Sequence, residues 1–141
     1  MDAALKTRMV THFEGLVMST PDLVEQFYGI LFERYPQVKP LFGVRSQESQ
    51  AKMLGEMLVT LMDRLDEQEW VRETLLAAGR RHEGYEVTAQ MYPWVGECLI
   101  EAMRRNAEEW DDALEQGWVS LYGVITELML EGHALARAEV D

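Results

Sequence analysis

The sequence has almost no cysteine, since Cys98 is the only one among 141 residues. A single thiol excludes an intramolecular disulfide, and this composition suits a reducing compartment. Long apolar runs are missing too, because no stretch approaches the roughly 18 residues that a membrane-spanning helix needs. The first residues, Met1 to Ala4, open no apolar signal stretch. We therefore expect a cytoplasmic protein that does not enter a membrane.

Positive charge is also scarce. Lysine and arginine number 13 against 25 aspartate and glutamate residues, which gives a formal net charge of -12. An acidic surface repels phosphate backbones and anionic lipids, so nucleic acid and membrane surfaces are disfavoured as partners. A length of 141 residues is typical of one domain, and with 48% apolar residues the chain can bury a sizeable core. We expect a single domain over residues 1–141.

Proline is rare, with four residues, and no segment alternates apolar and polar residues for long as a strand would. Apolar residues instead recur every three or four positions, which predicts an all-α fold. In the second helix we expect Thr20 as N-cap, Pro21 as the first helical residue and an end at Tyr35–Pro36. Four other helices are expected at residues 2–18, 36–41, about 48–65 and 69–81. A sixth helix should begin near residue 89, and a last long helix should begin after residue 106. Such unequal lengths favour irregular packing over an up-down bundle.

Familiar enzyme motifs are absent: the sequence has no GxGxxG, phosphate-binding loop, HExxH or GxSxG. Three histidines and one cysteine are too few for a metal site made of side chains alone. His82 stands at the end of the fifth expected helix, where its ring can turn into an adjoining pocket and ligate a haem iron. Its second ring nitrogen can then bond a backbone carbonyl one turn earlier. The alternative is a histidine favoured at that helix end by the helix dipole.

Two further polar residues lie on helix faces that are otherwise apolar. Tyr28 is in the middle of the second expected helix, and Gln50 shares a face of the fourth with Leu54 and Leu61. Both side chains can donate a hydrogen bond to a ligand in a pocket. The alternatives are a tyrosine at the edge of the core with its hydroxyl in water, and a solvated glutamine near a helix start. The residues alone leave both open.

Four segments occur in order along nearly the whole chain. They are residues 27–32 with Tyr35–Pro36 and Leu41–Phe42, residues 79–87, residues 92–99, and Trp118 with Tyr122–Gly123 and Ile125. Together they resemble the bacterial single-domain globins and the haem domain of flavohaemoglobins. This resemblance implies a globin fold, in which helices pack around a haem pocket, and haem b with its iron as the cofactor.

The resemblance also implies roles for individual residues. His82 would be the proximal ligand of the iron, and Tyr28 and Gln50 would face a bound gas from the opposite, distal side. The remaining haem contacts would be Leu54 on the distal side, Phe42 wedged against the porphyrin, Arg81 and Val87 on the proximal side, and Tyr92, which would help to orient His82.

Two features depart from the family pattern. The sequence ends at Asp141, so we expect no flavin or nicotinamide domain. When Tyr122–Gly123 are aligned, the family's proximal glutamate falls at His133, and Glu131 lies two positions away. A weaker anionic influence on His82 reduces the case for peroxidase-like chemistry.

The function implied is reversible, high-affinity binding of oxygen and of other diatomic ligands such as nitric oxide and carbon monoxide. One alternative is a nitric oxide dioxygenase that works with a separate reductase. The other is a haem-free, globin-like signalling module. Whichever function holds, we expect a monomer or a homodimer.

Overall fold

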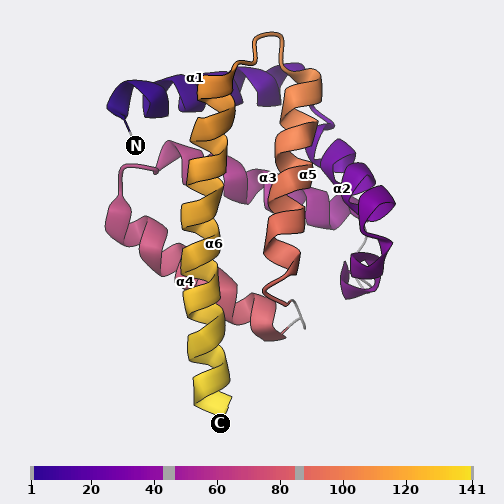
Figure 1. Ribbon diagram of the computed structural model, residues 1–141, viewed down its shortest axis with the longest axis vertical. Helices are drawn as coiled ribbons and strands as arrows, with labels where there is room; N and C mark the ends of the chain where they lie inside the picture. The colour runs from indigo at the N-terminus through magenta and orange to yellow at the C-terminus, as the bar shows by residue number, and fades with distance from the viewer. Residues whose placement is uncertain (1, 43–46, 85–87, 141) are drawn as a thin grey trace.

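Helices make up every element in the described part of the computed structural model, which covers residues 2–42, 47–84 and 88–140 (Figure 1). For residues 42, 47–51, 83, 84, 139 and 140 the backbone alone is described. The all-α prediction is confirmed. In chain order the elements are α1 (Ala3–Ser19), α2 (Leu23–Arg34), the 3-10 helix η1 (Pro36–Phe42), α3 (Gln47–Asp63), α4 (Gln68–Gly84), α5 (Met91–Asn106) and α6 (Asp112–Val140).

The start of α2 differs from the expectation. The helix begins at Leu23, with Asp22 in the N-cap position and no side-chain cap, so the predicted cap at Thr20 is wrong. Thr20 instead continues the hydrogen bonding of the last turn of α1, because its amide donates to the carbonyl of Leu16 at 2.9 Å. The Thr20 carbonyl then accepts from the Leu23 amide at 3.1 Å across a turn. Thr20 therefore ends α1 and does not cap α2.

The core forms where the apolar stripes of α1, α2, α5 and α6 meet. On α1 the inward residues Met9, Phe13 and Leu16 are buried, and Leu5 is partly buried. They belong to one cluster with buried residues of α2 and α5 and with Trp118 of α6, whose ring centroid is 5.6 Å from that of Phe13. In the part of the chain that the structure describes, no helix is long and apolar enough to cross a membrane.

Two glycines bring α4 and α6 into backbone contact. A Cβ at Gly79 of α4 would collide with the Met129 carbonyl, and a Cβ at Gly132 of α6 would collide with the Leu76 carbonyl. The two helices cross in Figure 1, and an ion pair between Arg72 and Glu131, with a nitrogen-to-oxygen distance of 2.7 Å, joins them near the crossing. No side chain larger than glycine fits at either position, so the backbones of α4 and α6 pack directly against each other where the two helices cross.

The crossing predicts opposite effects for two glycine substitutions in α6. Gly132→Ala should lower the free energy of unfolding by about 1–3 kcal/mol, because the added methyl must displace backbone. Gly123→Ala is the matched control: its Cβ would meet nothing within 4 Å, so alanine should stabilise the helix by about 0.5–1 kcal/mol. Urea unfolding followed by circular dichroism measures both. Equal stability of the two variants would show that the helices do not touch at Gly132.

Candidate functional site

His82 lies in the last turn of α4, just past the crossing with α6. Its Nδ1 is 2.7 Å from the carbonyl oxygen of Ala78, one turn earlier. A carbonyl only accepts, so Nδ1 carries the proton and Nε2 carries the lone pair of the neutral ring. Burial lowers the pKa of His82, which keeps the imidazole neutral at neutral pH. The ring is thus fixed in the tautomer that can ligate a metal through Nε2.

Tyr92, at the start of α5, borders His82 with a ring-centroid distance of 6.3 Å. The residue is only 4% exposed, and its hydroxyl is buried with no hydrogen-bond partner among the described residues. The carbonyl of Tyr92 accepts a hydrogen bond from the hydroxyl of Tyr122 on α6, and the Tyr122 ring covers Gly96 so closely that a Cβ there would collide with it. Thus α6 holds both α4 and the start of α5, the two elements beside His82.

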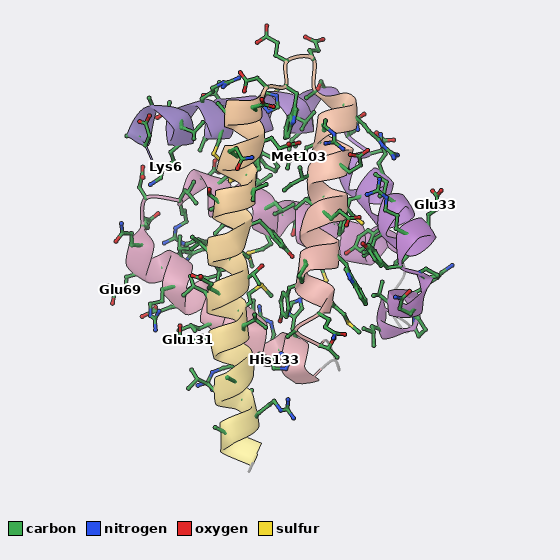
Figure 2. The ribbon with its side chains drawn as sticks, in the orientation of Figure 1. Lys6, Glu33, Glu69, Met103, Glu131 and His133 are labelled. Atoms are coloured by element: carbon green, nitrogen blue, oxygen red, sulfur yellow. The ribbon has the colours of Figure 1, made fainter. Side chains whose placement is uncertain are left out.

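Glu131 and His133, the two residues at or near the position of the family's proximal glutamate, lie in different surroundings. Glu131 turns to the surface, where it pairs with Arg72. His133 lies near the C-terminal end of α4, as Figure 2 shows, and its Nδ1 is buried without a hydrogen-bond partner in the described ranges. After burial, the charges of Arg81 and His133 add to the lowering of the pKa of His82. Burial is the main cause of the lowered pKa of His82, the hydrogen bond to Ala78 opposes it, and the described α6 residue that contributes is an imidazole and not a carboxylate.

Tyr28 lies on α2 and is 5% exposed. Its ring packs between aromatic neighbours, with centroid distances of 4.9 Å to Phe27 and 5.7 Å to Phe32. Burial raises the pKa of Tyr28 to about 12, so the hydroxyl stays protonated and can donate at neutral pH. Leu54 of α3 is half-buried and packs against the same core cluster.

The other predicted site residues are placed only in part. Arg81 is exposed beside His82. Phe42 ends η1 and Gln50 lies in the first turn of α3, but both side chains are outside the described residues, as is the whole of Val87. The structure thus brings Tyr92 to His82, and Tyr28 and Leu54 into one core.

Sequence reasoning missed the residues of α6 that hold the site together. A glycine inside a helix is costly and signals a close approach, so Gly132 carried a usable signal. The hydrogen bond from the Tyr122 hydroxyl to the Tyr92 carbonyl left no signal in the sequence, because apolar periodicity does not distinguish a tyrosine that donates a hydrogen bond from one that only packs.

A groove is lined by described residues of α1, α2 and α3, and the site candidates Tyr28, Leu54, Arg81, His82 and Tyr92 are not among them. It lies between the α1–α2 corner and the outer face of α3, and its apolar lining comes from Phe13, Val17, Pro21, Leu23, Val24, Leu58 and Val59.

Comparison with known proteins gives a consistent picture at the level of sequence. The family model described as Globin matches residues 25–129. The chain is 27% identical over 111 residues to a flavohemoprotein of Bacillus thuringiensis, which covers 77% of this chain and 27% of that protein. A flavohemoprotein of Pseudomonas aeruginosa is 28% identical over 127 residues, 84% of this chain and 32% of that one. The chain thus spans about a quarter to a third of the length of these relatives.

Shorter relatives and solved structures match over most of their length. An uncharacterized globin-like protein of Aquifex aeolicus is 27% identical over 111 residues, which is 77% of each chain. A bacterial globin of Campylobacter jejuni superposes with a TM-score of 0.80 at 25% identity, covering 94% of this chain and 97% of that one. An engineered carbene transferase from Rhodothermus marinus superposes with a TM-score of 0.86 at 22% identity, over 99% and 98% of the two chains, a likeness of fold alone.

Proposed function

The chain belongs to the globin family, and from this membership we propose that it holds haem b and binds oxygen and other diatomic gases reversibly and with high affinity. The predicted globin fold is confirmed. Globins in general bind haem and small gases. The single observation that carries the proposal for this chain is His82, a neutral imidazole oriented by its bond to the Ala78 carbonyl.

The residues present fit a haem. The oriented imidazole of His82 could ligate an iron, and the Tyr92 hydroxyl beside it is buried with no hydrogen-bond partner among the described residues, which favours a polar group near it. When bound, haem would supply an iron able to bind a diatomic gas. His82 would hold the iron, and the residues around the porphyrin would be Phe42, Leu54, Arg81, Val87 and Tyr92.

Tyr28 and Gln50 would slow the release of the gas by donating hydrogen bonds to it. Tyr28 is buried and protonated, so its hydroxyl can donate to a polar ligand inside a low-dielectric pocket, and the Gln50 amide would do the same. Each such hydrogen bond contributes about 1–3 kcal/mol, or up to roughly a hundredfold in the dissociation rate. Slow release of oxygen follows, which suits scavenging or sensing better than bulk transport.

The environment of His82 supports reversible binding over a role in oxidation. A carboxylate near the ring would increase its anionic character, whereas His133 is an imidazole and the nearby Glu131 is paired with Arg72 on the surface. Among the described side chains of α6, the one that contributes to the lowered pKa of His82 is therefore an imidazole and not a carboxylate. Nitric oxide dioxygenase activity with a separate reductase remains the second candidate, through the similarity to flavohemoproteins.

A gas-exchange experiment tests the proposal. The haem-loaded, reduced protein should take up oxygen and release it under vacuum over repeated cycles, with little oxidation to the ferric form. Nitrate formation from nitric oxide, sustained by a flavin reductase and a nicotinamide cofactor, would favour the dioxygenase. A purified chain that takes up no haem would contradict both and support a haem-free module.

A further inference from the structure

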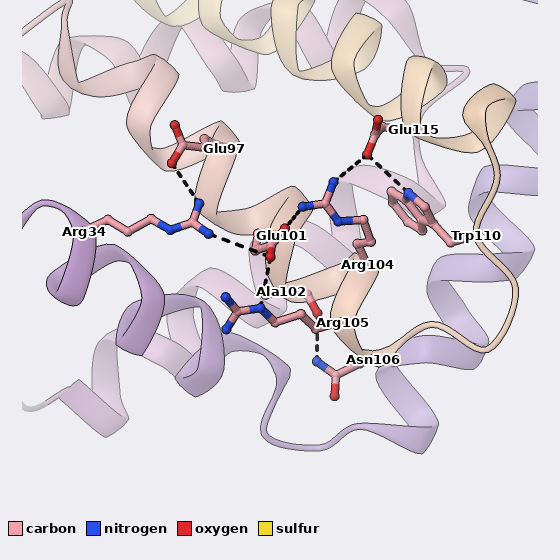
Figure 3. A network of polar contacts seen from close by, with 9 residues as sticks. All are labelled: Arg34, Glu97, Glu101, Ala102, Arg104, Arg105, Asn106, Trp110 and Glu115. Carbon is pink, nitrogen blue, oxygen red and sulfur yellow. Dashed lines mark hydrogen bonds and ion pairs between the residues drawn. The ribbon is translucent and has the colours of Figure 1, made fainter.

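The end of α2 is fastened to α5 by the carboxylate of Glu97. Its Oε2 accepts from Nη1 of Arg34 at 2.9 Å, as Figure 3 shows, and its Oε1 accepts from the hydroxyl of Tyr35 at 2.9 Å. The ring of Tyr35 stacks on Trp94 of α5, with centroids 4.7 Å apart and planes at 7°. One side chain of α5 therefore holds two consecutive residues at the end of α2.

A second carboxylate one turn further on supports this contact. Arg34 also reaches Glu101 at 3.7 Å, and the Glu101 side chain is only 13% exposed. Glu101 in turn pairs with Arg105 at 3.1 Å and with Arg104, which extends to Glu115 of α6 (Figure 3). Arg34 is therefore bridged between two carboxylates of α5, Glu97 and Glu101. The corner after α2 is thus tied through α5 to α6.

This corner joins elements that carry proposed haem residues. Tyr28 lies on α2 before the corner, Phe42 ends η1 directly after it, and Tyr92 begins α5 beside His82. We propose that Glu97 is a positioning residue, which fixes the α2–η1 corner on α5 and thereby sets where the Tyr28 hydroxyl lies relative to a bound gas. This role rests on the proposed function.

The effect of Glu97 on geometry should exceed its effect on stability. Exposed ion pairs add little to the stability of a fold, and the Arg34 and Glu97 side chains are 37% and 47% exposed. A hydrogen bond to a ligand, however, weakens steeply with small changes in distance and angle. A slight displacement of α2 would therefore leave the protein folded but loosen its hold on the gas.

Glu97→Gln tests the role, because it removes the charge and keeps the shape. In the haem-loaded protein, oxygen dissociation should rise by about two- to fivefold, while carbon monoxide dissociation changes little. The carbon monoxide stretching band should broaden or split, since it reports the electric field of the distal side. Tyr35→Phe, which removes one hydrogen bond and keeps the ring that stacks on Trp94, should shift the same two readouts by less.

Glu67→Gln is the matched control. It removes a carboxylate that pairs with Arg64 at 2.9 Å, at similar exposure, outside the α2–η1 corner. If Glu97→Gln gives the same oxygen dissociation rate and the same carbon monoxide band as Glu67→Gln, Glu97 is not a positioning residue, although the wild-type protein binds gas. If the wild-type protein itself binds no gas, the proposed function fails and this inference fails with it.

Discussion

Replacement of His82 by alanine is expected to abolish firm haem binding. The 2.7 Å contact of its Nδ1 with the Ala78 carbonyl fixes the tautomer of the imidazole and leaves Nε2 with the lone pair that a metal needs. Without it, the iron would have no protein ligand on the proximal side. Haem transfer to an apo-globin acceptor should be faster by orders of magnitude, and added imidazole should restore a six-coordinate spectrum.

The other two histidines are the controls for this prediction. His12 lies on α1, and its Nε2 is 3.1 Å from the carbonyl of Glu109, in the segment between α5 and α6. His133 lies on α6 outside the ligand position that we assign. His12→Ala and His133→Ala should therefore keep the Soret band. If the His82 variant retained haem with an unchanged ferrous spectrum, the proximal ligand would have to be a different residue.

Replacement of Tyr28 by phenylalanine should raise the oxygen dissociation rate by about tenfold or more. One good hydrogen bond of roughly 1.4 kcal/mol corresponds to a factor of ten. Burial raises the pKa of Tyr28 to about 12, so the lost group is a protonated donor at any pH where the protein would work. Carbon monoxide carries little charge when bound, and its dissociation should change much less. Stopped-flow measurement of both gases gives the comparison.

A double-mutant cycle extends the test to Gln50. Gln50→Leu should also speed oxygen release, by less than Tyr28→Phe. If both side chains donate to the same ligand, the two effects should be non-additive in the double variant. An oxygen dissociation rate of Tyr28→Phe equal to that of the wild type would mean that the tyrosine only packs, and the high-affinity distal pocket would be refuted.

Local patterns predicted most of the elements and one contact of the site. Apolar periodicity located α1 to α6, because burial of one helix face leaves its signature within a few residues, and Pro36 marked the start of η1. The bond from His82 to a carbonyl one turn earlier was also predictable, since it lies within one helix. The start of α2 was not, because Thr20 ends α1, where its amide donates to the Leu16 carbonyl, and α2 begins only at Leu23, after a turn.

Contacts between distant segments set the rest. Glu131 and His133 are two positions apart, yet Glu131 pairs with Arg72 while His133 acts on His82. That division depends on how α4 crosses α6 at Gly79 and Gly132, which no local pattern specifies. The hold of Glu97 on Arg34 and Tyr35 is of the same kind, because its partners lie 62 and 63 positions away in the sequence.

Above all, we propose that this chain holds haem through a single proximal histidine and leaves a position for gas. The absorption spectrum of the purified, reduced protein, recorded before and after carbon monoxide is added, tests this most directly. We predict a Soret band of five-coordinate, histidine-ligated haem that shifts fully to a six-coordinate carbon monoxide form. A protein that takes up no haem, or whose reduced spectrum does not respond to carbon monoxide, would contradict the account.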